Sequence, residues 1–122
     1  MLTNIEVFSK VKKHLLSQNE KCISNNVCAL KNEKGLSCAI GCLIPDKLYT
    51  PDLEDFYISI DGAYDRGSAN KLVKILELIN IPNTNLVRVM LKKLQEIHDE
   101  YEVDQWPKQL DLLEADIVSN EI

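Results

Sequence analysis

The stretch VCALKNEKGLSCAIGCLIPDKLY, residues 27–49, carries most of the unusual chemistry of this chain. It holds three of its four cysteines, which are Cys28, Cys38 and Cys42. Gly35 can adopt positive φ in the turn KNEKG, so residues 26–31 and 36–40 are predicted to pair as an antiparallel β-hairpin. That pairing would bring the first cysteine close to Cys38 or Ala39. The apolar segment that follows predicts a short buried helical turn.

The remainder of the chain is predicted to be mainly helical. Apolar residues recur at three- and four-residue steps along residues 3–18 and through most of residues 68–120. Helix starts are predicted at the caps Thr3 or Asn4, Thr50, Ser68, Thr84 and Asp104. FYISIDG (56–62) alternates well enough to predict a short strand. We therefore expect a mainly α fold with a small antiparallel β-hairpin at about residues 26–40. It would be one globular domain over residues 1–122 with about four to five helices.

Composition and charge exclude several function classes. The chain is 45% hydrophobic and 27% charged, which is typical of a soluble globular protein, and no apolar run could span a bilayer. The N-terminus carries an early acid and no long apolar block, so we expect a cytoplasmic protein without a secretory signal. The net charge is −5, and residues 96–122 hold nine acids against one lysine. This balance argues against nucleic-acid binding, which needs a basic face.

The four cysteines admit several interpretations. A disulfide scaffold is not expected in a reducing cytoplasm, and the cysteine gaps contain no close pair typical of a zinc knuckle, although His14 or His98 could complete a ligand set. No metal and no cofactor is therefore expected. Reduced cysteine packs as a small apolar residue, and a tight corner between hairpin and helix needs small side chains. The sequence favours packing, with Gly41 allowing a close approach to the neighbouring strand.

A nucleophilic cysteine is the alternative to packing. Cys38 is predicted near a helix start, where the pKa of a thiol is lowered, and Cys42 follows one turn later. His98 could act as the base and Asp99 could orient it. Because no oxyanion motif is evident and His98 lies at the edge of an apolar stripe, catalysis is the second interpretation.

Other residues are candidates for binding. Asp46 and Tyr49 are predicted in a loop after the buried segment, where functional groups often lie. Trp106 could stack on a ligand or anchor the core. Glu114 and Asp116 belong to the acidic C-terminal third, which could meet a basic protein surface.

The motif residues resemble a family of short proteins encoded in tailed-phage genomes and in bacterial chromosomes, often within prophages. The resemblance rests on Cys28, a central block from Gly35 to Tyr49, and later Leu94, Gln95, His98, Asp99 and Trp106. Members commonly have Tyr-Arg where this chain has Leu30-Lys31, and often Glu-Gly near Glu54-Asp55. The family implies a setting, that of a phage-type accessory protein, but no activity. The second half of the shared block is expected to pack against the first.

Three functions follow as hypotheses. The first is a non-enzymatic phage-type protein that binds a host protein or defence component in the bacterial cytoplasm, such as a counter-defence inhibitor. The second is a cysteine-dependent hydrolase or transferase that uses Cys38 or Cys42 with His98 and Asp99. The third is a small-ligand sponge with a pocket near Asp46, Tyr49 and Trp106. The sequence gives neither the partner nor the oligomeric state.

Overall fold

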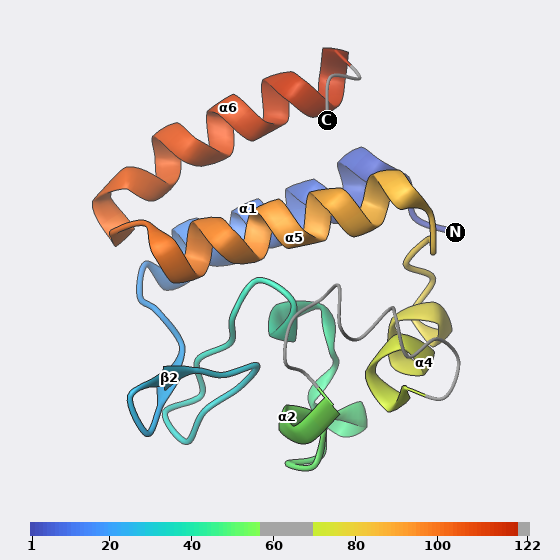
Figure 1. The fold of residues 1–122 in the computed structure, drawn as a ribbon, viewed down its shortest axis with the longest axis vertical. Helices are drawn as coiled ribbons and strands as arrows, with labels where there is room; N and C mark the ends of the chain where they lie inside the picture. The colour runs from blue at the N-terminus through green and yellow to red at the C-terminus, as the bar shows by residue number, and fades with distance from the viewer. Residues whose placement is uncertain (57–69, 120–122) are drawn as a thin grey trace.

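The computed structural model describes residues 1–56 and 70–119 and shows a mainly helical fold with one small sheet (Figure 1). The longer helices are α1 (Asn4–Gln18), α4 (Lys71–Leu78), α5 (Asn85–Glu100) and α6 (Trp106–Ser119). The shorter elements are β1 (Ile23–Ser24), β2 (Val27–Cys28), α2 (Leu53–Phe56) and 3₁₀ turns at Gly41–Leu43, Asp46–Leu48 and Val103–Gln105. In Figure 1, α1 and α5 lie between α6 on one side and the hairpin, α2 and α4 on the other. The predicted fold class is confirmed.

Helix α1 forms where its local sequence predicts it. The Thr3 hydroxyl accepts a hydrogen bond from the Glu6 N–H, and the Glu6 carboxylate accepts one from the Thr3 N–H, which makes a complete capping box. One face of the helix is fully buried through Val7, Phe8, Val11 and Leu15. That face packs on both α5 and α6. The first and the last helix are therefore packed together.

Helices α5 and α6 carry the predicted apolar stripes. Thr84 caps α5 by accepting from the Val87 N–H, and Trp106 begins α6 fully buried. The expected cap at Asp104 is wrong. This residue lies inside a 3₁₀ turn, and the capping box is formed by Glu102 and Gln105 immediately around it.

The β-hairpin differs from the predicted pairing. Strand β2 pairs with β1, the segment before it, in the register Ile23–Cys28 and Ser24–Val27. Asn25 and Asn26 both have positive φ, as a tight two-residue hairpin turn requires. The predicted partner segment makes only one isolated bridge, between Lys31 and Ser37. Cys28 therefore lies opposite Ile23 and not opposite Cys38 or Ala39.

The corner after the hairpin is tight, as its small residues predict. The Cys38 N–H donates to the Leu30 carbonyl, and the chain then makes the 3₁₀ turn that begins at Gly41. A Cβ atom on Gly41 would lie only 1.9 Å from the Leu30 carbonyl oxygen. Only glycine can occupy this position without moving the backbone.

The middle of the chain is only partly described. The helix expected from Thr50 begins at Leu53, and the helix expected from Ser68 begins at Lys71, where the Asn70 side chain accepts from the N–H groups of the first turn. The strand predicted over 56–62 falls almost wholly within residues 57–69, which lie outside the described residues.

One hydrophobic core joins all the layers. Two of its members are Cys22 and Cys38, which are fully buried, so the packing prediction is confirmed for both. Cys42 is half-buried and packs against the same core, whereas Cys28 is exposed. The one cysteine at the surface therefore differs in its surroundings from the other three.

Candidate functional site

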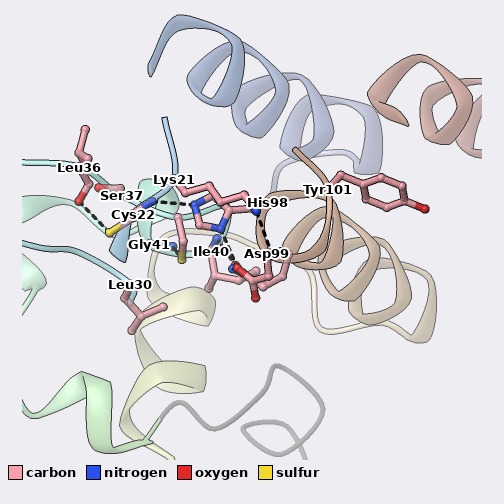
Figure 2. Close-up of polar contacts among 12 residues, drawn as sticks. Lys21, Cys22, Leu30, Leu36, Ser37, Ile40, Gly41, His98, Asp99 and Tyr101 are labelled. Atoms are coloured by element: carbon pink, nitrogen blue, oxygen red, sulfur yellow. Dashed lines mark hydrogen bonds and ion pairs between the residues drawn. The ribbon is translucent and has the colours of Figure 1, made fainter. Parts of the chain in front are cut away.

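His98 is fully buried and is the centre of a polar network (Figure 2). The Cys22 N–H donates to Nε2 of His98 over 3.0 Å. A backbone N–H can only donate, so Nε2 carries no proton and Nδ1 must carry it. Nδ1 donates in turn to Oδ1 of Asp99 over 2.6 Å. Both ring nitrogens are thus satisfied, and the ring also stacks on Trp106 with 5.5 Å between centroids.

Asp99, near the end of α5, accepts hydrogen bonds from neighbouring side chains. Its Oδ1 accepts from His98 and also from Nε2 of Gln95, over 2.8 Å, and the Cys28 sulfur lies within 4.8 Å of its carboxylate. Burial alone would raise the pKa of Asp99, but these hydrogen bonds outweigh it and hold the pKa below its ordinary value. Asp99 is therefore a stable carboxylate with one-third of its side chain exposed.

Gln95 links Asp99 by hydrogen bonds to the cysteine-rich stretch of residues 27–49. Its Oε1 accepts from the Ile40 N–H over 3.2 Å while its amide donates to Asp99. Gln95, His98 and Asp99 lie three and four residues apart, so they share one face of α5. We call this set the His98 network; it consists of Cys22, Cys28, Ile40, Gln95, His98, Asp99 and Trp106. It joins the two halves of the motif, as the sequence led us to expect.

None of the four thiols is activated. Burial raises the pKa of Cys22 to about 11 and that of Cys42 to about 12, and it raises the pKa of Cys38 further. Although Cys28 is exposed, partial desolvation of its thiol, followed by the neighbouring Asp99 carboxylate, raises its pKa to about 11. A nucleophilic cysteine needs a shift in the opposite direction.

The structure brings His98 and Asp99 together, but it does not supply them with the expected thiol. Cys38 Sγ accepts from the Gly41 N–H, and the Cys42 thiol donates to the Ala39 carbonyl. The cysteine that lies beside His98 and Asp99 is Cys28.

The sequence did not predict a catalytic or binding role for Cys28, Cys22 or Gln95. The three- and four-residue spacing from Gln95 to His98 and Asp99 could have indicated a shared face. The contribution of Cys22 is a backbone N–H, which no side-chain pattern reveals.

Asp46 and Tyr49 belong to a second cluster. The Tyr49 hydroxyl donates to Glu54 over 2.6 Å, and the Glu54 carboxylate also accepts from the N–H groups of Leu30 and Lys31. The Lys31 ammonium pairs with Asp46 at 3.1 Å and lies 5.9 Å from the centre of the Tyr49 ring. Lys31 thus contacts both candidate residues.

The remaining candidates lie on α6. Trp106 is fully buried and its indole N–H donates to the Tyr101 carbonyl, so its ring faces the core. Glu114 pairs with Lys12 of α1 at 2.9 Å. Asp116 lines a shallow groove of about 340 Å³ between α5 and α6. Of the two acids singled out in the sequence, Asp116 borders this groove, and Glu114 is held in the ion pair with Lys12.

Comparison with protein-family models, with curated proteins and with solved structures found no match. The resemblance to phage and prophage proteins therefore stays a prediction. Within the described residues, no helix is long and apolar enough to cross a membrane.

Proposed function

We propose that this chain is a non-enzymatic binding protein of phage type, and that its α5–α6 groove holds a host protein. The groove is the observation that carries the proposal. Its lining combines apolar and charged side chains, namely Lys93, Glu96, Ile97, Tyr101, Gln109, Leu112, Leu113 and Asp116. Such a mixture, with an apolar centre and a charged rim, is typical of protein interfaces.

The apolar part of the groove offers an anchor point. Leu112 is 54% exposed, although it lies beside Ile97 and Leu113, which are almost fully buried. An apolar side chain from a partner could cover Leu112 and remove this area from water. The groove lies between two helices, and an amphipathic helix is the element that such grooves commonly accept.

The rim favours a basic partner. Among its charged residues, Glu96 and Asp116 outnumber Lys93, and the wider segment from residue 96 to 122 holds nine acids and one lysine. Complementary charge speeds association and orients the two surfaces. The occupant we propose is a host protein that presents an amphipathic helix with basic flanking residues. A host defence component inhibited by this contact is the sharper form of the hypothesis.

The chemistry of the buried residues supports binding over catalysis. The imidazole of His98 and the carboxylate of Asp99 are occupied by hydrogen bonds within the fold, and the pKa of every thiol is raised. These groups stabilise the fold as they stand. No observation favours the hydrolase or the ligand sponge in the same way.

The test begins by trapping the partner in cells. A photo-reactive amino acid at Leu112 should cross-link one host protein, whereas the same residue at Leu78, which is 68% exposed on α4, should not. The trapped protein is then purified and its affinity for the wild-type chain is measured. Leu112→Glu and Asp116→Lys should each weaken binding by about 10-fold or more.

Two controls separate binding from folding. Leu78→Glu should leave the affinity unchanged, and all variants should keep the circular dichroism spectrum and melting temperature of the wild type. Glu114 is not a suitable site because its ion pair with Lys12 joins α6 to α1. If the purified partner binds Leu112→Glu and wild type equally well, the groove is not the binding surface and the proposal fails.

A further inference from the structure

Three metal-ligating side chains lie close together where the His98 network reaches the protein surface. Cys28, His98 and Asp99 each offer one ligand atom, and these atoms lie within 4.8 Å of one another. The geometry points to a binding site for a soft divalent cation of the Zn²⁺ type at this position. The site is separate from the α5–α6 groove and does not depend on the function proposed above.

The donor set has the right chemistry for zinc. Thiolate sulfur, imidazole nitrogen and carboxylate oxygen bind Zn²⁺ at about 2.0–2.3 Å, usually in a tetrahedron. Ligand atoms around such an ion lie roughly 3.3–3.8 Å apart, by that bond length and geometry. His98 Nδ1 and Asp99 Oδ1, at 2.6 Å, lie closer than this range, and all three ligand atoms lie within 4.8 Å of one another. Metal binding therefore requires the His98 and Asp99 atoms to move apart.

The ligands come from two different elements, and their surroundings position them. Cys28 is on β2 and is exposed, so a cation can reach its sulfur from solvent. Gln95 donates to Oδ1 of Asp99, and this bond does not involve His98, so it can persist when His98 binds a metal. Hydrogen bonds of this kind hold a carboxylate in place and raise its affinity for a metal. Three protein ligands leave a fourth position for water.

Binding requires two protons to move. The Cys28 thiol must release its proton to solvent, because the thiolate is the ligand. His98 must lose the Nδ1 proton that it now donates to Asp99. If Nε2 takes up that proton, it can no longer accept from the Cys22 N–H, and this bond breaks. Metal binding at His98 therefore breaks the hydrogen bond between the Cys22 N–H and Nε2 of His98.

The nearest cation opposes binding. The Lys21 ammonium donates to the Asp99 carbonyl over 3.2 Å, and its charge acts on the Cys28 thiol. Removing this charge while keeping the length of the side chain should strengthen binding of a divalent cation. Lys21→Gln is therefore expected to bind the metal more tightly than the wild type.

The experiment uses the reduced, chelator-treated full chain and titrates it with Co²⁺. A thiolate–Co²⁺ charge-transfer band should appear at one equivalent and vanish when Zn²⁺ is added. Cys28→Ser should lose the band, whereas Cys42→Ser, which removes the other thiol that is not fully buried, should keep it. Because Cys28 is exposed, its substitution leaves the fold available for the test.

A second readout reports on His98. Hydrogen exchange of the Cys22 amide should become at least about 10-fold faster when Zn²⁺ is bound, because its acceptor is lost. The proposal is overturned if the wild type gives no band, if the band survives Cys28→Ser, or if the Cys22 amide keeps its protection in the metal-bound form. Lys21→Gln binding no tighter than wild type would likewise contradict the assigned position of the ion.

Discussion

Helix α5 serves two regions of the molecule that differ in almost every respect. Gln95, His98 and Asp99 face the His98 network, where their side chains hydrogen-bond to groups within the chain. Lys93 and Glu96, on the other side, border the open groove with α6. Histidine and aspartate often act in catalysis, but on the inner side of α5 they form hydrogen bonds that join distant segments of the chain. The outer side, with ordinary apolar and charged residues, is the one left for a partner.

The largest loss of stability in the region of the His98 network is expected from adding one methyl group at Gly41. Gly41→Ala would place a Cβ atom 1.9 Å from the Leu30 carbonyl oxygen, which also accepts from Cys38. Because the contact is with backbone, no side-chain rotation relieves it, and we expect a loss of about 3 kcal/mol or more in the free energy of unfolding. Urea denaturation measures this loss.

Gly35→Ala is the matched control. A Cβ atom at Gly35 meets nothing within 4 Å, but its φ of +82° is unfavourable for alanine. The expected cost is about 1–2 kcal/mol. A larger loss at position 35 than at position 41 would show that the close approach at Gly41 is less important than stated.

Removing the hydrogen bonds of His98 while keeping a ring should have the next largest effect. His98→Phe leaves the Cys22 N–H and the Gln95–Asp99 pair without their central partner. A buried N–H without an acceptor costs about 1–3 kcal/mol, so we expect a loss of about 2 kcal/mol. The second histidine serves for comparison. His14→Phe removes one half-buried bond to the Ser37 carbonyl, which Gln18 also supplies, and should cost less than half as much.

The reactivity of the thiols compares the exposed cysteine with the buried ones, and measuring it does not require a substitution. The pKa of Cys28 is raised from 9.0 to about 11, so its thiolate fraction near pH 7 is about 100-fold below that of an ordinary thiol. Alkylation should be slow at pH 7 and should rise about tenfold per pH unit up to pH 10, because only the thiolate reacts.

Mass spectrometry of each cysteine checks the order of labelling. Cys28 should react before Cys42, and Cys22 and Cys38 should react only after unfolding, since both are fully buried. Fast labelling of Cys38 or Cys42 at pH 6 would instead mean an activated thiolate and would favour the enzyme hypothesis.

The smallest effect is expected at the ion pairs between α1 and α6. Lys12 pairs with Glu114 at 2.9 Å and with Asp111 at 3.3 Å, and all three side chains are partly open to water. Lys12→Met should cost less than about 1 kcal/mol, and the difference should shrink in high salt. Denaturation at two ionic strengths tests this. A loss as large as that of His98→Phe would show that the α1–α6 ion pairs hold the layers together.

Local signals predicted the helices well and the site poorly. The caps at Thr3 and Thr84 and the apolar stripes of α1, α5 and α6 are short-range features, and the structure confirms them. The β1–β2 hairpin has only two residues in each strand, too few for alternation to be visible. Its signal was the turn Asn25-Asn26, where both residues have positive φ.

The composition of the His98 network depends on long-range contacts. Cys22 lies 76 residues from His98, and Ile40 lies 55 residues from Gln95. The resemblance predicted that the two halves of the motif would pack together. It could not show which cysteine would lie beside Asp99, because that follows from the pairing of β2 with β1.

The position of α1 between its two partners has a consequence for the chain during synthesis. Helix α1 is synthesised before α5 and α6, yet its buried face, which includes Phe8 and Leu15, packs on those two helices. Until they are made, its apolar face is open to water and to chaperones. The core around α1 therefore closes only when α6 is available.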